Sequence, residues 1–340
     1  MRETPKLSCK ALFKVHGDGA AIGHVFGAEN FPPDDNAFKR FGLVGAVQHV
    51  FLDIHEGETF GIVGLPGAGK STLLRLLAGL IRPSFGEIFL DGQNLLKMRA
   101  RELIALRRRK MGMVFQEFAL LPHLTVLQNV AFALSLQGVK RGPAESRAAG
   151  MVGLLGLKGC EGRYPRELSD AQQQRVGIAR ALVAEPEIWF LDAPFSALDP
   201  LNRHEMQGEF LRLQGLMRKT AVFTTGEMGE AVRLADRIAV MRGGRILQVA
   251  SPEALMLEPA DEHVRELTRD VPRDKVVSVG AIMQPGATGK GPGIEASQKV
   301  AEVAQAVIAA GAPVMVCRDG RPVGAVEAEA VIRVLVGPRE

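Results

Sequence analysis

The apolar and polar positions between residues 48 and 80 predict two strands, a loop and a helix in succession. Gln48–His55 alternates apolar and polar residues, as a half-buried strand does, and Thr59–Val63 is an apolar run of the length of a buried strand. Beyond a glycine-rich stretch the leucines recur with a helical period, until a glycine and a proline close the pattern. The chain is therefore expected to pass from a buried strand through a loop into a helix.

Two later apolar runs, Ile188–Leu191 and Ala221–Thr224, predict further strands that alternate with helices, as in a mostly parallel α/β sheet. The stretch Thr125–Leu182 has helical periodicity and almost no strand pattern, which predicts an inserted helical subdomain at about residues 120–182. Residues 18–45 contain glycines, prolines and a few aromatics, and we interpret them as an insertion whose order the pattern does not define.

The last seventy residues follow a different pattern and predict a small α+β unit. Its expected elements are, in order, a strand at Val276–Met283, a glycine-rich loop at 286–293, a helix at Ser297–Ala310, strands at Val314–Cys317 and Pro322–Val326, and a helix that ends near Val336. Asp319-Gly320 between the last two strands is a hairpin signal. We therefore predict a large domain at residues 1–270 and a smaller one at 271–340.

Composition narrows the class of protein. Apolar residues make up 46% of the 340 and charged residues 24%, which is typical of an ordinary folded protein. The 42 basic residues exceed the 38 acidic ones by too little to predict a nucleic-acid partner. Three dispersed cysteines argue against a disulfide framework and favour a reducing cytosol. The longest apolar stretch, Val303–Cys317, is too short to cross a bilayer, so we expect any membrane link to come through a partner.

The glycine-rich stretch, Gly64-Leu65-Pro66-Gly67-Ala68-Gly69-Lys70-Ser71, matches the phosphate-binding pattern GxxxxGK[ST] in the required strand–loop–helix context. Glycines let successive N–H groups and the helix N-terminus face an anion, Lys70 adds a positive charge, and Ser71 can offer its hydroxyl to Mg²⁺. A glycine-rich turn closed by a capping serine is the alternative, which the flanking strand and helix disfavour. The residues expected to bind the phosphates of ATP are Gly64, Gly67, Ala68, Gly69, Lys70, Ser71 and Thr72.

An acidic residue ends the strand Ile188–Leu191. In a P-loop protein, a carboxylate at the end of such a strand lies beside the metal ion that accompanies the nucleotide. We therefore expect Asp192 to be a magnesium residue. Alone this pattern is weak, but the phosphate loop upstream makes it strong.

Further segments resemble the ATPase of an ABC transporter. Leu168-Ser169-Asp170-Ala171-Gln172 resembles its signature, Gln116 in Met113-Val114-Phe115-Gln116 its Q-loop, and Ser196-Ala197-Leu198-Asp199 its D-loop. More specifically, Phe118–Val126, the insertion ahead of Val47 and the tail resemble the ATP-binding subunit of glycine betaine/proline (quaternary amine) importers. The similarity is strong over about residues 7–283 and weak over the rest of the tail. It implies an α/β P-loop NTPase fold of the ABC ATPase type with an inserted helical subdomain.

The resemblance also implies partners. Two ATPase subunits, identical or paralogous, would face each other head to tail, so that Ser169 of one chain reaches the nucleotide of the other. Ser71, Gln116 and Asp192 would surround Mg²⁺. His16 occupies the place where the family stacks an aromatic ring on adenine, with Phe13 as a possible substitute. The subunit would bind an integral-membrane permease on the cytoplasmic face of the membrane and serve, indirectly, an extracytoplasmic solute-binding protein.

Three positions depart from the family pattern. The glutamate that polarises the attacking water is replaced by Ala193, the switch histidine by Gly226, and the paired glycines of the signature by Asp170 and Ala171. Loss of a positioned base typically costs about 10² to 10⁴ in rate. We therefore expect ATP to bind and hydrolysis to be weak, with no intact catalytic residue at these positions.

Alternatives stay open at this point. Glu227 or Asp199 could orient the water in place of the missing glutamate. The chain could be a non-hydrolysing regulatory or scaffold protein that uses ATP as a structural ligand, or an ABC ATPase acting on DNA or ribosomes, against which the modest charge and the permease-type segment argue. The tail resembles a single cystathionine β-synthase (CBS) type module, with Pro322–Val326 as its most typical piece; it could pair across a dimer, cap the ATPase domain, or lack a ligand.

Overall fold

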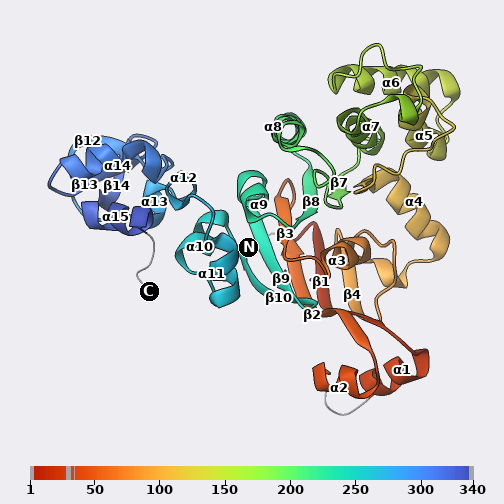
Figure 1. The fold of residues 1–340 in the computed structure, drawn as a ribbon, viewed down its shortest axis with the longest axis horizontal. Coiled ribbons are helices and arrows are strands. Elements are labelled where there is room, and N and C mark those ends of the chain that lie inside the picture. Colours follow the sequence, from red (N-terminus) through yellow and green to blue (C-terminus); the bar gives the residue numbers. More distant parts are fainter. Residues whose placement is uncertain (1–3, 28–31, 34, 337–340) are drawn as a thin grey trace. The chain divides into compact units, whose positions relative to one another are not determined.

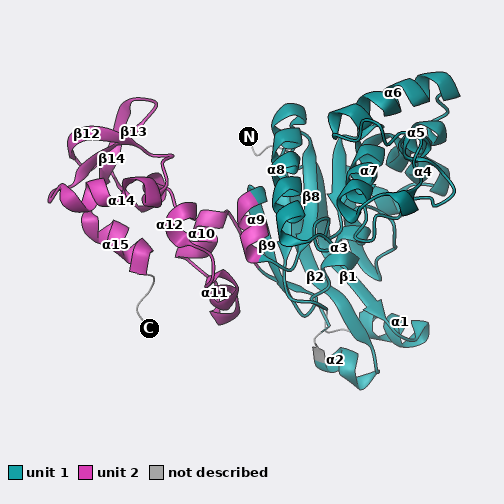
Figure 2. Ribbon diagram, turned by 45° about the horizontal axis from the view of Figure 1, so that its top comes forward, with its two compact units in different colours: residues 1–227, 234–247 teal, residues 228–233, 248–340 magenta. Residues whose placement is uncertain are grey.

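The computed structural model describes residues 4–27, 32–33 and 35–336. They divide into two compact units (Figure 2): residues 1–227 with 234–247, and residues 228–233 with 248–340. The predicted domain boundary near residue 270 falls inside the second unit, and the division at that residue stays a prediction.

The first unit contains five strands and the beginning of the sixth, β10, of a six-stranded sheet that holds the predicted strand–loop–helix unit near its centre (Figure 1). Its strand order is β10 (Arg245–Ala250), β9 (Arg237–Arg242), β3 (Thr59–Val63), β8 (Thr220–Thr225), β7 (Ile188–Leu191) and β6 (Met111–Val114). The pairs from β9 to β6 are all parallel. The α/β architecture is thereby confirmed, and the carboxyl ends of β3, β8, β7 and β6 meet at one edge.

A second sheet of the first unit is antiparallel and has the order β2 (Val44–Ile54), β1 (Leu7–His16), β4 (Phe85–Leu90) and β5 (Gln93–Asn94). The helix α3 (Lys70–Leu77) contacts β1 and β2 of this sheet as well as β8 of the central sheet. Its four leucines are buried. The helix is therefore packed through its apolar side chains against strands of both sheets.

The described residues between β1 and β2, whose order the sequence did not define, form two helices. They are α1 (Gly19–Gly27) and α2 (Asp35–Arg40); residues 28–31 and 34 of the insertion lie outside the described residues. Val25 of α1 and Phe38 of α2 pack with Phe13, Val15 and Leu43 in a small apolar cluster. The helices of the insertion thus pack on the end of β1 through this small cluster.

The remaining helices of the first unit are α4 (Ala100–Lys110), α5 (Val126–Leu136), α6 (Arg141–Leu154), α7 (Asp170–Leu182) and α8 (Pro200–Met217), with 3₁₀ turns at Leu95–Lys97 and Pro165–Glu167. The three helices α5, α6 and α7 pack against one another (Figure 1). They correspond to the stretch Thr125–Leu182, in which the sequence predicted helices and no strand.

The second unit contains the tail. Its elements are most of α9 (Met228–Leu234), then α10 (Pro252–Leu257), α11 (Glu262–Thr268), α12 (Arg273–Val276), α13 (Val279–Ile282), α14 (Val300–Ala309) and α15 (Ala328–Val336), with a sheet of order β11 (Gln284–Pro285), β14 (Arg321–Val326), β13 (Val314–Arg318) and β12 (Lys290–Glu295). The hairpin at Asp319-Gly320 is confirmed, since both residues have positive φ, as a type I′ turn requires.

Two predictions for the tail are wrong. The expected strand at Val276–Met283 is instead the end of α12 and the one-turn helix α13. An apolar run of this length is compatible with either element, and here Ser278, between the two helices, is held by Glu253 of α10 through its backbone N–H and its hydroxyl, each at 3.2 Å. The segment is therefore helical where a residue from another helix, Glu253, binds it.

The expected glycine-rich loop at 286–293 contains most of strand β12, which pairs in parallel with β13. A Cβ atom on Gly293 would lie 2.4 Å from the sulfur of Cys317, and one on Gly289 would lie 2.2 Å from the backbone nitrogen of Met315. The glycines are therefore present because the neighbouring strand approaches closely, which local turn rules do not reveal.

Candidate functional site

The glycine-rich loop lies between β3 and α3, where the strand and helix patterns placed it. A Cβ atom on Gly64 would lie 2.2 Å from the carbonyl oxygen of Met241. Gly69 has φ +101°, and a Cβ there would lie 2.1 Å from the carbonyl oxygen of Ala46. Because backbone of other segments presses on both positions, only glycine fits, and the curved loop conformation is built in before any ligand arrives.

The loop is also tied to the hairpin between β9 and β10. The Gly244 N–H donates to the carbonyl of Ala68 at 2.9 Å, and the Gln48 N–H donates to the carbonyl of Gly244 at 2.8 Å. Gly67, at the exposed tip, has φ +80°. The loop backbone is thus bonded to the β9–β10 hairpin on one side, while the exposed tip at Gly67 leaves its other side accessible to a phosphate chain.

Lys70 begins α3 and turns its ammonium group back over the loop. Its Nζ donates to the carbonyls of Gly64 at 2.7 Å and Leu65 at 3.0 Å. Burial lowers the pKa of Lys70, and the charge of Asp192 opposes that lowering. Ser71 and Thr72 follow in the first helical turn, each half-buried. The loop therefore combines a positive charge, two hydroxyls and a helix N-terminus, which is the combination that binds phosphate.

Asp192 follows β7 directly, as the sequence predicted, and only 1% of the residue is exposed. Its Oδ1 accepts a hydrogen bond from the hydroxyl of Thr224 at 3.1 Å, and its Oδ2 lies 3.0 Å from Nη2 of Arg75. Thr224 belongs to β8 and Arg75 to α3. Neither Thr224 nor Arg75 was identified from the sequence as a partner of Asp192. The sequence indicated only that Arg75 stands one helical turn beyond Ser71, on the same helix.

Gln116 lies two residues beyond β6, exposed, at the same edge of the sheet as Asp192. The segment after it is clamped to α7, because the Arg180 guanidinium donates to the carbonyls of Phe118 at 3.0 Å and Ala119 at 2.7 Å. Arg180 was not expected to act on this segment. Its bonds link the Q-loop-like segment to the helix that begins with the signature-like residues.

The signature-like residues open α7. The Ser169 side chain accepts from the Gln172 N–H at 3.3 Å, while the Gln172 side chain accepts from the Ser169 N–H at 3.1 Å. This is a capping box, so Ser169 has a structural task in the chain itself. Asp170 is exposed in the first turn, and Ala171 is buried. Position 170 therefore carries a carboxylate at a helix end that is open to solvent.

Ala193 and Gly226, the positions at which the family pattern predicts a base and a histidine, lie at the same sheet edge. The Ala193 N–H donates to the Thr224 hydroxyl at 2.9 Å, so its backbone is anchored, but its methyl group offers no base. A Cβ atom on Gly226 would have the carbonyl oxygen of Gly64 as its nearest neighbour, at 4.0 Å. Gly226 therefore stands beside the first residue of the phosphate loop, with open space where a side chain would project.

The two candidate substitutes for the missing base have other partners. Glu227 lies 2.6 Å from Nη1 of Arg203, whose guanidinium also donates to the carbonyls of Phe195 and Leu198. Asp199 caps α8 by accepting from the N–H groups of Leu201 and Asn202, each at 3.1 Å. Its hydrogen bonds from Asn202 hold the pKa of Asp199 below its ordinary value. Both carboxylates therefore already have protein partners, and their role as a substitute base stays a prediction.

Of the two adenine-stacking candidates, only His16 is accessible. It is exposed at the end of β1, whereas Phe13 is fully buried and its ring contacts those of Phe26 and Phe85. The idea that Phe13 substitutes for the stacking aromatic is therefore wrong, because its ring is part of the core.

The oxygen donors at the sheet edge fit Mg²⁺. A serine hydroxyl, a carboxylate and an amide oxygen, from Ser71, Asp192 and Gln116, are hard donors of the kind this ion prefers. Mg²⁺ is usually held by one or two protein groups together with substrate phosphates, so a small donor set beside a phosphate loop is sufficient. The ion would help neutralise charge on the terminal phosphates when bound.

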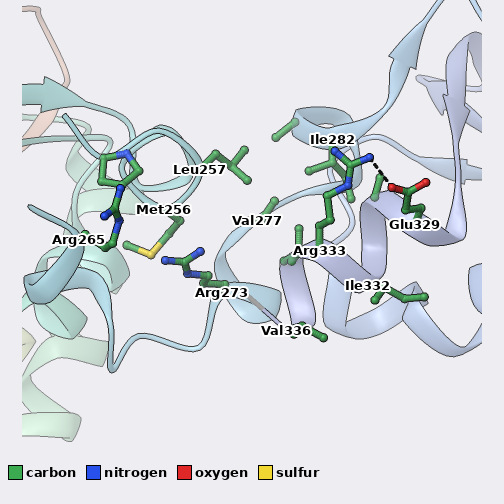
Figure 3. Close-up of a pocket in the computed structure, with 14 residues that line it drawn as sticks. Met256, Leu257, Arg265, Arg273, Val277, Ile282, Glu329, Ile332, Arg333 and Val336 are labelled. Atoms are coloured by element: carbon green, nitrogen blue, oxygen red, sulfur yellow. Dashed lines mark hydrogen bonds and ion pairs between the residues drawn. The ribbon is translucent and has the colours of Figure 1, made fainter. Parts of the chain in front are cut away.

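A cavity of about 730 Å³ lies within the second unit (Figure 3). Its lining includes the apolar side chains of Met256, Ile282 and Val336. It also includes three basic residues, Arg265, Arg273 and Arg333. Arg333 is paired with Glu329 at 2.9 Å. The predicted phosphate and metal residues do not line this cavity.

The phosphate loop after β3 and the buried carboxylate after β7, on a mostly parallel sheet, define a P-loop nucleotide-binding protein. The comparisons identify its family. A profile described as "ABC transporter" matches residues 47–196. The trimethylamine N-oxide transport system ATP-binding protein TmoW of Pelagibacter ubique is 49% identical over 280 residues, with 82% of each chain covered. TmoW of Ruegeria pomeroyi is 42% identical over 334 residues, with 98% of each covered.

A third relative and a solved structure are similar to the chain and belong to the same family. The glycine betaine/carnitine transport ATP-binding protein GbuA of Listeria monocytogenes is 42% identical over 278 residues, which cover 82% of this chain and 70% of GbuA. A solved dimer of the ATP-binding cassette MJ0796 with ADP and phosphate matches with a TM-score of 0.61 and 30% identity, covering 72% of this chain and 98% of that one. The chain belongs to the ABC transporter family, among its ATP-binding proteins.

The described part of the chain contains no helix with both the length and the apolar character needed to cross a bilayer.

Proposed function

We propose that this chain is the ATP-binding subunit of an importer for small methylated amines, the solute class that includes trimethylamine N-oxide and glycine betaine. The observation that carries the proposal is the assembled phosphate loop in a chain that is 42% identical, over almost its whole length, to a trimethylamine N-oxide transport ATP-binding protein. Solute choice within this class belongs to the permease and the solute-binding protein. The ATP-binding subunit supplies the driving step.

ATP binding is assigned to the backbone of residues 64–69 with Lys70, Ser71 and Thr72, and Mg²⁺ to Ser71, Asp192 and Gln116. His16 is the proposed adenine contact. The geometry supports this assignment because the loop is held in its curved form by backbone contacts and Lys70 already lies over its opening. Binding would then require little rearrangement of the loop.

Two subunits are proposed to close on the nucleotide, with Ser169 of each chain facing the phosphates held by the other, as the match to a dimeric cassette supports. The dimer would bind a membrane permease on the cytoplasmic face and work with an extracytoplasmic solute-binding protein. The likeness of the tail to a CBS module stays a prediction.

Hydrolysis is proposed to be slow. Ala193 cannot accept a proton and Gly226 has no side-chain donor, while the carboxylates of Glu227 and Asp199 are held by Arg203 and by the start of α8. A missing base corresponds to a rate about 10² to 10⁴ times below that of an intact enzyme. The same observations favour the second candidate function, a scaffold whose dimer closes on ATP without using it as fuel.

Binding and turnover of the purified chain, alone and with its permease, test the proposal. A fluorescent ATP analogue should bind, and Lys70→Ala should weaken binding; Lys158→Ala, an exposed lysine on the helical subdomain, should not. Equal binding by wild type and Lys70→Ala would refute the site. Phosphate release that rises with added solute in the permease complex would establish the importer, and binding without any release would establish the scaffold.

A further inference from the structure

An arginine of α3 reaches the carboxylate that the site assigns to the metal. Arg75 stands four residues after Ser71, and positions i and i+4 of a helix lie on one face. Its Nη2 is 3.0 Å from Oδ2 of Asp192. The helix face that offers the Ser71 hydroxyl therefore also presents a cation to the other half of the same site.

The two partners differ in exposure. The Asp192 side chain is 1% exposed, whereas that of Arg75 is 49% exposed. A buried carboxylate without a counter-charge is costly, since its desolvation is uncompensated. The half-exposed guanidinium, in contrast, can turn into solvent at small cost.

In the described part of the chain, the Lys70 ammonium also interacts with the charge of Asp192, but it forms no ion pair with the carboxylate. The Thr224 hydroxyl donates to Oδ1 and itself accepts from the Ala193 N–H. The Lys70 ammonium is directed to the carbonyls of Gly64 and Leu65. Among the described residues, the ion pair of Asp192 is the one with Arg75.

We propose that Arg75 is the resident counter-ion of Asp192: it holds the carboxylate while the site is without nucleotide and releases it when a magnesium nucleotide enters. Arg75 is thereby a positioning residue that sets how strongly nucleotide binding depends on Mg²⁺. With Arg75 present, the carboxylate repels a metal-free triphosphate less, and the metal ion must displace the guanidinium before it binds. Removal of Arg75 should therefore weaken the binding of the metal-free nucleotide and strengthen the binding of the magnesium nucleotide. The dependence of nucleotide binding on Mg²⁺ then increases. This inference rests on the ATP binding proposed above.

The measurement is the dissociation constant of a fluorescent ATP analogue, in Mg²⁺ and in EDTA, for the full chain. In Arg75→Met the ratio of the EDTA value to the Mg²⁺ value should rise about tenfold over wild type, the size that one charge-assisted hydrogen bond supports. Arg75→Lys should restore most of the wild-type ratio because it keeps the charge. Arg107→Met, which removes a guanidinium that donates to Gly79 at the other end of α3, should leave the ratio unchanged.

A double-mutant cycle separates this role from general stabilisation. In an Asp192→Asn background, Arg75→Met should no longer change the ratio, since its charged partner is absent. If Arg75→Met does not fold, Arg75→Gln, which keeps a hydrogen-bond donor without charge, takes its place. A ratio within twofold of wild type in the folded Arg75 variant, or the same change in the Asp192→Asn background, would overturn the inference. Failure of wild type to bind the analogue at all would instead refute the proposed function.

Discussion

Single residues decide whether this nucleotide site can also be a hydrolytic one. Ala193 has its backbone fixed by Thr224 at the end of the sheet, and Gly226 faces open space beside Gly64. The backbone of Ala193 is thus anchored and position 226 has room for a side chain, although neither residue carries the group that the family pattern predicts. A site of this kind should regain activity when the side chains are restored.

We expect Ala193→Glu combined with Gly226→His to raise steady-state phosphate release at least about tenfold, because a base and a donor to developing charge are each usually worth more than that. The Gly226 position accepts a side chain, since nothing lies nearer than 4.0 Å to its added Cβ. Adding Lys70→Ala to the double variant should abolish the gain. An unchanged rate in a folded double variant would show that the fault lies elsewhere, at Asp170 or in dimer closure.

Cysteine reactivity is a second property at the residue scale. Burial raises the pKa of the Cys9 thiol to about 12, and the backbone of Leu52 opposes this only in part. Since only the thiolate reacts, a group with so high a pKa stays protonated and inert at pH 8. The folded chain should therefore incorporate an alkylating reagent at Cys9 slowly at pH 8, and quickly in urea, as measured by mass spectrometry of the peptide. Equal rates in both conditions would contradict this burial.

At the scale of elements, four charged side chains tie the antiparallel sheet to the central one. Lys6 precedes β1, Asp91 follows β4, Lys110 ends α4 and Glu187 precedes β7. Lys6 bonds to Glu187 and lies 2.8 Å from Asp91, while Lys110 lies 2.6 Å from Asp91. The hydrogen bond from Lys6 holds the pKa of Glu187 below its ordinary value of 4.5, and burial opposes it.

Glu187→Gln should lower the free energy of unfolding at pH 7 by at most about 1 kcal/mol, because the carboxylate is partly exposed and screened. A carboxyl whose pKa is lowered by folding stabilises the fold above its unfolded pKa, and this contribution is lost as the pH falls through the lowered folded value. The difference between variant and wild type in urea unfolding should therefore be smaller at pH 4 than at pH 7. Glu329→Gln, in an exposed pair with Arg333, should show almost no effect at either pH.

Local sequence patterns predicted some secondary-structure elements correctly and others wrongly. The strands β3 and β7 occur at the predicted residues, where each apolar run is followed directly by the first glycine of the phosphate loop or by an acidic residue. The segment at 276–283 and strand β12 were mispredicted, because Glu253 and the backbone of β13 act on them from distant parts of the chain. Such contacts override local propensity and leave no periodic signal.

At the scale of the whole molecule, the proposed assembly is a dimer in which Asp170 comes near the partner's phosphates. A carboxylate there opposes a triphosphate by like-charge repulsion. Asp170→Gly should therefore increase the fraction of dimer in saturating ATP several-fold, measured by analytical ultracentrifugation. Glu262→Gly, which removes an acid from the equivalent first position of α11, is the matched control and should leave the dimer fraction unchanged. An unaltered dimer fraction in Asp170→Gly would show that this carboxylate does not limit closure.

The sequence by itself determined the phosphate loop and the acidic residue that follows β7, because each depends on neighbouring positions in the chain. The absence of the usual base and switch histidine was implied by the resemblance to the ABC family. The tertiary structure alone decided that Arg75 and Thr224 hold Asp192, that Arg203 engages Glu227, and that Phe13 is core. Asp192 and Arg75 are separated by 117 positions in the chain. Their pairing follows from the order of strands in the sheet, which local spacing does not encode, and from the need of a buried carboxylate for a counter-charge.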